Sequence, residues 1–574
     1  ATELISLGIL FLCAIIGGFI ATKFKQPAVF GLLLVGAIIG PNALNLVQDA
    51  KIINIMAEFG AILILFIVGL EFDISKLMKL GARSLLIGLL KFAIVLFIGY
   101  ETTLLLGFGS KVALFVGVIL SFSSTVVVVK VLEQKHMFSR SEVPLLIAVL
   151  IIEDIIAVLT LTFFSGVKDS GIGMISIFEK IIFSIAILVF VYYVLMKMLK
   201  HVVNILVKNN NDESIFAFLS LGLGALFSSF AFYLGLTPSA GAFLAGSLIA
   251  SLPNSKEYGH AIRPYALIFT SIFFISMGTL VNFSVIESNL PLILALIVTI
   301  FISRFIAIGF LTFLLANFRD EQPFFSSIAM ISIGEFSLLV AKESEKFGVG
   351  VDLVTITAAI IFITAILMAI GINYSEKLHS KLNSRMPIKA KIKLESLSNY
   401  MRKFFDQLEI ESSSTRRLRT ESKFAFILMI LALFLFFILK RVSVLVKQNY
   451  HPFVLYAFYV VSAFLMIYLL QVIYKKIRSI TQTLSIVLTY VDNSRNIKKC
   501  NAILNTLLLS LILFFSAMLF PFAMFMFNLN VWANLIPFML VIFAFYYLKR
   551  LAALIDSNST YVPRGIVGVS FAKF

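Results

Sequence analysis

The stretch VPLLIAVLIIEDIIAVLTLTFF, Val143 to Phe164, is apolar enough to span a bilayer, yet two adjacent acids, Glu153 and Asp154, lie at its midpoint. A hydrocarbon core about 30 Å thick requires about 20 residues of α-helix. Each ionised side chain at that depth costs roughly 2.5–3.5 kcal/mol on insertion scales. The two acids therefore indicate a function that needs charge inside the membrane.

Composition extends this prediction to the whole chain and excludes other classes of protein. The 574 residues are 60% hydrophobic and 13% charged, which is typical of a polytopic membrane protein. The net charge of +17 comes from Lys and Arg in loops, so we expect contact with membrane lipid and not with nucleic acid. The sequence carries no nucleophile–base pair, metal-ligand cluster or phosphate-binding loop. We therefore predict no enzyme activity and no cofactor.

Apolar runs divide the chain into an all-α membrane domain over 1–373, a basic linker over 374–422 and a four-helix membrane domain over 423–574. Thirteen spans are predicted in the first domain, near 4–21, 27–40, 53–70, 84–106, 111–130, 143–165, 177–199, 214–235, 238–252, 266–282, 291–316, 324–344 and 352–373. Four more are predicted near 423–446, 452–474, 502–528 and 531–549, with a loop starting at Lys475. Counting basic residues in the loops predicts an N-terminus outside the cell membrane and a cytoplasmic linker.

Two of these spans are too short to cross the membrane straight, and their sequences match. GLLLVGAII (Gly31 to Ile39) aligns with GAFLAGSLI (Gly241 to Ile249) at an offset of 210, and two further matches have offsets of 209 and 212. Matched spans are an odd number of helices apart, so they run in opposite directions. This predicts an inverted repeat, with units over about 1–166 and 210–373, an architecture of secondary transporters whose ion site lies at the membrane midplane.

Hydroxyl groups lie in the middle of two further repeat-related spans. Ser123, Ser124 and Thr125 interrupt the apolar run VGVILSFSSTVVVVKVL, and Glu335 follows a Gly in MISIGEFSLLVAK. Such residues suit broken helices, because they satisfy freed backbone groups or offer oxygens to a cation. The alternative is that the hydroxyls bond to carbonyls of their own helix. Their paired positions, beside a helix that carries an Asp, favour an ion site.

Asp154 is the predicted ligand of that site, for Na⁺, K⁺ or a proton. Burial and a bound cation shift the pKa of a carboxyl group in opposite directions, so one group can exchange the two species. Consecutive helix residues point about 100° apart, so Glu153 faces elsewhere. We expect it to pair with Arg304 as a neutral strut, although Asp154 could take the arginine instead. An arginine stays protonated, so this pairing predicts electroneutral exchange of one proton per cation.

Three other charged residues within apolar runs, Lys91, Glu101 and Glu58, lie closer to the ends of their spans. We expect their side chains to reach the loops rather than the midplane. The sequence leaves two alternatives to an exchanger open. One is a channel-like potassium-efflux system. The other, a sodium-coupled symporter of organic solutes, would need a larger polar pocket than these hydroxyls provide.

Five motifs in order resemble the monovalent cation:proton antiporter family, which includes potassium-efflux and sodium/proton exchangers. They cover about residues 1–373 and read QPAVFGLLLVGAIIGPNAL (26–44), LILFIVGLEFD (63–73), SSTVVVVKVL (123–132), TPSAGAFLAG (237–246) and IGEFSLLV (333–340). The resemblance implies crossed discontinuous helices, a mobile core, a homodimer, alternating access and an essential membrane aspartate at Asp154. Arg304, Glu335 and Lys130 are the residues expected to compensate charge around it.

The chain departs from the family pattern in three places. Glu153 stands where Asp, Asn or Gln is common, and Arg304 stands where Lys is common. The potassium-efflux members carry a C-terminal nucleotide-binding domain, whereas no GxGxxG motif follows a strand here. We therefore expect no nucleotide-binding domain, and a structural or partner-binding role for the last four helices.

Overall fold

The computed structural model describes residues 2–24, 28–46, 50–71, 82–137, 139–168, 213–234, 238–252, 255–279, 281–316, 318–319, 321–385, 452–492, 497–527 and 535–556, and scattered positions within 187–197 and 398–439. These described residues contain helices and no strand. Apolar segments become helices in a membrane because a helix satisfies its own backbone groups where water cannot. The predicted spans 177–199 and 423–446 lie outside the described residues apart from scattered positions.

The chain divides into two compact units, which are described separately: Ala1–Arg385 with Met518–Asn530, and Met386–Ala517 with Val531–Phe574. The helices of the first unit are α1 (Thr2–Lys23), α2 (Ala28–Ile39), α3 (Ala50–Glu71), α5 (Ala82–Leu105), α6 (Ser110–Ser121), α7 (Thr125–Gln134), α8 (Val143–Lys168), α10 (Glu213–Tyr233), α11 (Pro238–Ala250), α12 (Ser255–Thr279), α13 (Phe283–Ser288), α14 (Leu290–Arg304), α15 (Leu311–Leu315), α16 (Gln322–Ala329), α17 (Glu335–Glu345), α18 (Leu353–Gly371) and α19 (Ser375–Arg385).

Seven helices among the described residues are long and apolar enough to cross a membrane. They cover Arg83–Leu105, Val143–Phe164, Ser214–Tyr233, Glu257–Thr279, Leu290–Leu315, Leu353–Lys381 and Asn501–Phe522. Five shorter apolar helices accompany them, among them Phe30–Ile39 and Gly241–Ala250. The fold is therefore that of an all-α polytopic membrane protein.

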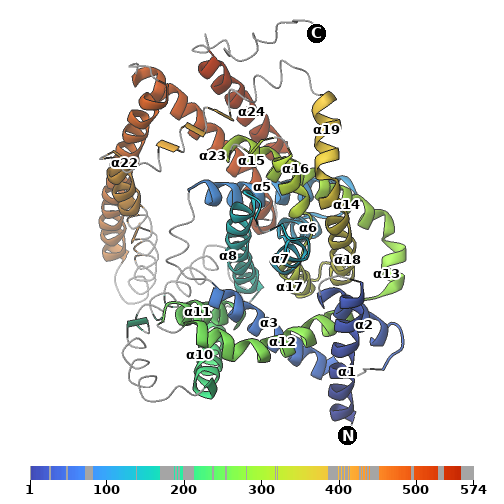
Figure 1. The fold of residues 1–574 in the computed structure, drawn as a ribbon. Coiled ribbons are helices and arrows are strands. Elements are labelled where there is room, and N and C mark those ends of the chain that lie inside the picture. The colour runs from blue at the N-terminus through green and yellow to red at the C-terminus, as the bar shows by residue number, and fades with distance from the viewer. Residues whose placement is uncertain are drawn as a thin grey trace, which may run out of the picture. The chain divides into compact units, whose positions relative to one another are not determined.

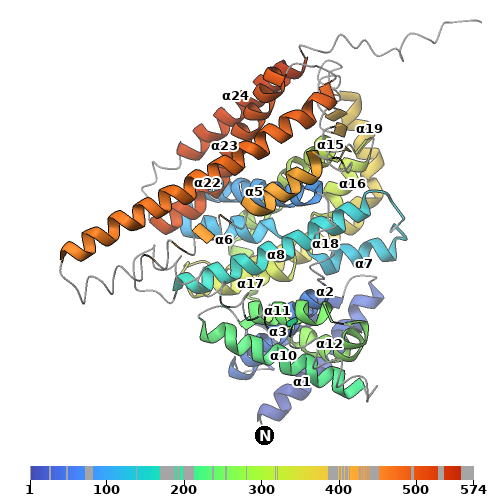
Figure 2. The same ribbon diagram turned by 90° about the vertical axis from the view of Figure 1, so that its left-hand side faces the viewer.

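All helices of the first unit except α13 and α19 form two groups (Figures 1 and 2). The scaffold group comprises α1, α2, α3, α10, α11 and α12, and the crossing group comprises α5 to α8 and α14 to α18. The predicted spans 111–130 and 324–344 both lie in the crossing group, and each is two helices separated by a short extended segment. The first breaks between α6 and α7, and the second between α16 and α17.

Pairs of glycines bring helices of the scaffold group into backbone contact. A Cβ on Gly36 would lie 2.2 Å from the carbonyl oxygen of Ile275, and one on Gly278 would lie 2.4 Å from that of Leu33, so α2 and α12 touch at these two positions. Gly246 of α11 and Gly69 of α3 meet in the same way. Gly246 follows Gly36 by 210 residues and Gly278 follows Gly69 by 209, which are the offsets of the sequence repeat. The two glycine contacts are therefore formed by repeat-related residues.

In the second unit, α22 runs over 41 residues from Pro452 to Asp492. The sequence predicts a loop from Lys475, but the helix continues through it, because polar residues 475–480 contain no Gly or Pro to end a helix. Helix α23 (Ile497–Phe527) belongs to this unit up to Ala517, and α24 (Leu535–Asp556) belongs to it as well. A further helix over 414–425 belongs to the second unit.

Candidate ion-binding site

The first helix break exposes the carbonyl end of α6 in the interior of the crossing group. Helix α6 ends at Ser121, and Phe122 is extended, with φ −90° and ψ 134°. The last four carbonyls of a helix lack partners within it, so they need donors from elsewhere. Arg304 supplies them. Its guanidinium donates to the carbonyl oxygens of Leu120 at 2.9 Å and of Ser121 and Phe122 at 3.3 Å.

A buried ion pair lies against the same break. The ammonium group of Lys91, on α5, is 2.6 Å from Oε2 of Glu153 on α8, and the two side chains are 0% and 1% exposed. Lys91 also donates to the hydroxyl of Ser123 at 3.0 Å and to the carbonyl of Ser121. The backbone N–H of Ser123 donates to Glu153 at 2.8 Å. These hydrogen bonds offset the desolvation of the two charges and fix the break to α5 and α8.

The predicted pair between Glu153 and Arg304 is therefore wrong. Arg304 is also fully buried, but its guanidinium faces the carbonyls of α6. A guanidinium has five N–H donors in one plane, so it can bind several carbonyls better than an ammonium can. The prediction that Lys91 reaches a loop is wrong as well. Helix α5 packs against α6, α8 and α14, which leaves Lys91 no route to water. Glu101 is likewise buried, whereas Glu58 is exposed, as predicted.

Asp154 faces the second half of the broken helix. It is 4% exposed, and the hydroxyl of Thr125 lies 3.2 Å from each of its carboxylate oxygens. Thr125 is the first residue of α7, so the carboxylate lies near the N-terminal end of a helix, where the macrodipole favours negative charge. Lys130 lies on α7, and its side chain is outside the part of the chain that the structure describes.

The second break crosses the first and bonds to it directly. Helix α16 ends at Ala329, and α17 begins at Glu335 after an extended Gly334. The N–H of Ser124 donates to the carbonyl of Ser332 at 2.9 Å, and the hydroxyl of Ser124 lies 3.2 Å from Oε2 of Glu335. Buried backbone N–H and C=O groups need hydrogen-bond partners. Here a group freed in one break finds its partner in the other break.

Gly334 is the point of closest approach between the two breaks. A Cβ at this position would lie 2.4 Å from Cβ and 2.7 Å from Cα of Ser124. The second of these contacts involves backbone, which cannot move aside as a flexible side chain could. Only glycine therefore fits here.

Outside the apolar spans, Arg140 joins the loop before α8 to the start of α16. Its guanidinium lies 2.7 Å from Glu142 and 2.6 Å from Glu321, and it stacks over the ring of Phe325 at 4.0 Å. Burial acts to lower the pKa of Arg140, and the hydrogen bonds to Glu321 and then Glu142 outweigh it, so that the pKa is raised. This cluster ties together the two elements that carry Asp154 and the second break.

The geometry thus separates the predicted site residues into two sets. Asp154 and Thr125 come together as a candidate cation or proton site. Glu153, Ser123 and Ser124 support the crossing instead, with Arg304, and Ser123 also accepts from Lys91. Among the described residues no group of three or more His, Cys, Asp or Glu side chains could hold a metal ion.

Comparisons with known proteins identify the family and the fold. The model of the family described as "Sodium/hydrogen exchanger, transmembrane" matches residues 8–373. The chain belongs to this family. The match covers the scaffold and crossing groups and ends at the beginning of the predicted linker.

Relatives of this family member include named cation antiporters. The probable Na⁺/H⁺ antiporter GerT of Bacillus cereus is 30% identical over 339 residues, which are 58% of this chain and 88% of GerT. K⁺ efflux antiporter 5 of Arabidopsis thaliana is 27% identical over 349 residues, or 59% of this chain and 61% of that protein. The sodium proton antiporter MjNhaP1 of Methanocaldococcus jannaschii shares the fold, with a TM-score of 0.51 over 67% of this chain and 99% of that one, at 19% identity.

Sequence reasoning missed two residues that matter for this arrangement, Lys91 and Arg140. The run SLLIGLLKFAIVLF has Lys91 at its eighth position and no other charge, which was a usable signal, because a snorkelling lysine keeps its charged end in water. The contacts of Arg140 join segments about 180 residues apart, and no local pattern predicts them.

Proposed function

We propose that this chain is a secondary transporter that exchanges a monovalent cation, Na⁺ or K⁺, for protons at Asp154 by alternating access. The observation that carries the proposal is a nearly buried carboxylate at the crossing of two broken helices, with a hydroxyl at 3.2 Å. Membership of the sodium/hydrogen exchanger family supports it.

The chemistry follows from one site that accepts either of two cations. An ionised Asp154 attracts a dehydrated Na⁺ or K⁺, to which Thr125 adds a hydroxyl oxygen. A protonated Asp154 has no net charge and releases the metal ion. Because each occupant excludes the other, the loaded states carry either the cation or the proton across, which is the requirement for exchange.

We further propose that exchange is electroneutral, one proton for one cation. The reason differs from the one that the sequence suggested, because Glu153 pairs with Lys91 and not with Arg304. Lys91 has three acceptors and Glu153 has two donors, so the pair is held as one unit that adds no net charge beside Asp154. A lysine, unlike an arginine, can release its proton, so the stoichiometry depends on this pair staying intact.

The wider architecture belongs to the same proposal. The matched glycine contacts of α2 with α12 and of α11 with α3 support an inverted repeat within a thirteen-helix unit. We propose an N-terminus outside the cell, a cytoplasmic linker over 374–422, and four further membrane helices after it. We also propose a homodimer, embedded in lipid, as the functional form.

The test uses purified protein in liposomes that contain a pH-sensitive dye. A proton gradient is imposed first. Added Na⁺ or K⁺ should then change the internal pH, at a rate that saturates with cation concentration. Comparison with Li⁺ gives the cation preference. Single-channel currents without proton movement would favour the channel-like alternative. Cation flux that depends on an organic solute would favour the symporter.

Stoichiometry is tested in the same liposomes with an imposed membrane potential. A potential supplies about 2.3 kcal/mol per 100 mV for each net charge moved. One-for-one exchange predicts that the potential alone drives no uphill cation movement. Potential-driven accumulation by the wild type would mean that a second proton moves in each cycle, with Lys91 as its carrier.

A further inference from the structure

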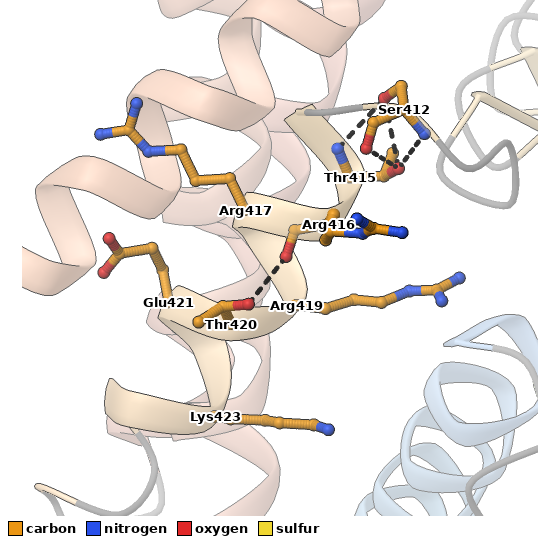
Figure 3. A pocket seen from close by; sticks show the side chains of 8 residues that line it. All are labelled: Ser412, Thr415, Arg416, Arg417, Arg419, Thr420, Glu421 and Lys423. Atoms are coloured by element: carbon orange, nitrogen blue, oxygen red, sulfur yellow. Dashed lines mark hydrogen bonds between the residues drawn. The ribbon is translucent and has the colours of Figure 1, made fainter.

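A basic face lies on the helix over 414–425 in the second unit. Figure 3 shows the side chains of Arg416, Arg419 and Lys423 pointing to one side of this helix, while Arg417 and Glu421 point to the other. The spacing of three and then four residues places the first three side chains one above another on a helix surface. All three are exposed. A cavity of about 830 Å³ lies against this helix, and the residues lining it are Ser412, Thr415, Arg416, Arg417, Arg419, Thr420, Glu421 and Lys423.

The start of the helix is capped, and its one acid that lines the cavity is paired with another helix. Ser412 and Thr415 cap its start, with the N–H of each donating to the hydroxyl of the other at 2.8 and 3.1 Å. The acid of the cavity, Glu421, is bound to Lys476 of α22 at 2.8 Å and is thus committed to a structural ion pair. Among the described residues that line the cavity, the other charged side chains are basic.

An apolar segment follows the basic face along the chain. Residues 424–439, FAFILMILALFLFFIL, follow the basic face without a charged residue. Ala432 of this segment packs against Leu469 and Ile473 of α22, and Leu428 and Leu435 pack against the same cluster. Large apolar or aromatic side chains of this pair are exposed nearby, namely Phe424, Leu431, Phe464, Tyr468 and Tyr474. Basic side chains directly above an exposed apolar surface with tyrosines are typical of the headgroup level of a bilayer.

We infer that Arg416, Arg419 and Lys423 form a binding site for the phosphate group of an anionic phospholipid, whose acyl chains lie along the adjacent apolar surface. Guanidinium groups bind phosphate oxygens through paired N–H donors, and an ammonium adds a point charge. The cavity is large enough for a headgroup. A lipid is favoured over a free phosphate because the apolar segment begins at the residue after Lys423.

The test measures lipid binding to the full-length protein by native mass spectrometry, from micelles containing phosphatidylglycerol or phosphatidylcholine. Each basic residue near a membrane surface contributes about 1 kcal/mol, which is about fivefold in affinity. R416Q should weaken binding of phosphatidylglycerol about fivefold, and R416Q/R419Q/K423Q about a hundredfold. K403Q is the control, since it removes one positive charge from an exposed side chain of the second unit that does not line the cavity, and it should bind like the wild type.

Three outcomes would overturn the site. They are equal loss in R416Q and K403Q, equal binding of phosphatidylcholine and phosphatidylglycerol by the wild type, and displacement of the lipid by inorganic phosphate at equal concentration, which would make a soluble anion the ligand. R416K/R419K keeps the charge and should retain most of the binding. Thermal unfolding of each variant in neutral detergent separates loss of the site from loss of the fold.

Discussion

The two helix breaks of the crossing group are stabilised by different means. The first, between α6 and α7, is surrounded by full charges, with Arg304 on the carbonyl end and the Lys91–Glu153 pair beside it. The second, between α16 and α17, bonds mainly to the first, through Ser124 and a glycine contact. One break is therefore anchored to the surrounding helices by charge, and the other is anchored to its partner by shape and hydrogen bonds.

This difference indicates that the two breaks have different roles. Charges that hold the first break also fix α8, which carries Asp154, so the site keeps its geometry when it changes occupant. The second break contributes backbone and the acid Glu335, which lies at the N-terminal end of α17, where the helix dipole stabilises negative charge. Damage to the first break should accordingly cost more than damage to the second.

The largest effect is expected from Lys91→Met, which leaves Glu153 charged and buried. Removing one partner of a buried pair costs about 3–5 kcal/mol of unfolding free energy. The matched control is Lys346→Met at the far end of α17, where Lys346 and Glu343 are 2.7 Å apart and the lysine is about half exposed. That change should cost at most about 1 kcal/mol. Denaturant or thermal unfolding in detergent measures both.

The double variant Lys91→Met/Glu153→Leu sharpens this prediction. Replacing both members of a buried pair by apolar residues is often neutral, so the double variant should recover most of the loss. If it is as unstable as Lys91→Met alone, the ion pair is not the reason for the loss, and the charge-based account of the first break fails.

The next effect is expected from Gly334→Ala at the second break. The added Cβ overlaps Ser124, and overpacking of this kind costs about 1–3 kcal/mol. Exchange should fall sharply, because the crossing must open to fit the methyl group. Gly18→Ala on α1 is the control, since nothing lies within 4 Å of its added Cβ. Equal stability and equal transport in the two variants would show that the close contact between Gly334 and Ser124 is not needed.

The smallest effect is expected from Ser337→Ala. Its hydroxyl donates to the carbonyl of Ile119 on α6 at 2.7 Å, a contact between the two broken helices. One such hydrogen bond contributes about 1 kcal/mol. Ser344→Ala, whose hydroxyl bonds within its own helix to Ala341, should change stability by close to zero. A larger loss in Ser344→Ala than in Ser337→Ala would contradict the idea that hydrogen bonds between the breaks hold the second one.

The sequence predicts the membrane class, the family and the position of both breaks, because apolar length, repeated motifs and mid-span hydroxyls are local signals. It also brings Asp154 and Thr125 into one site. Pairings of charges across helices could not be predicted in the same way. Whether Glu153 meets Lys91 or Arg304 depends on how α5 and α14 are placed around α6, and both basic residues lie in apolar runs of similar appearance. A guanidinium can donate to several carbonyls at once, and this property could have favoured Arg304 as the partner of the α6 carbonyls and Lys91 as the partner of Glu153.

The most direct test of the central claim is cation-driven proton flux by Asp154→Asn in proteoliposomes. An amide cannot bind or release a proton in this range, so flux driven by Na⁺ or K⁺ should be lost while the unfolding temperature stays close to that of the wild type. Asp406→Asn, a change at a partly buried carboxylate in the second unit, controls for general effects of the substitution and should exchange normally. Flux by Asp154→Asn at the rate of the wild type would contradict the assignment of Asp154 as the exchanging group.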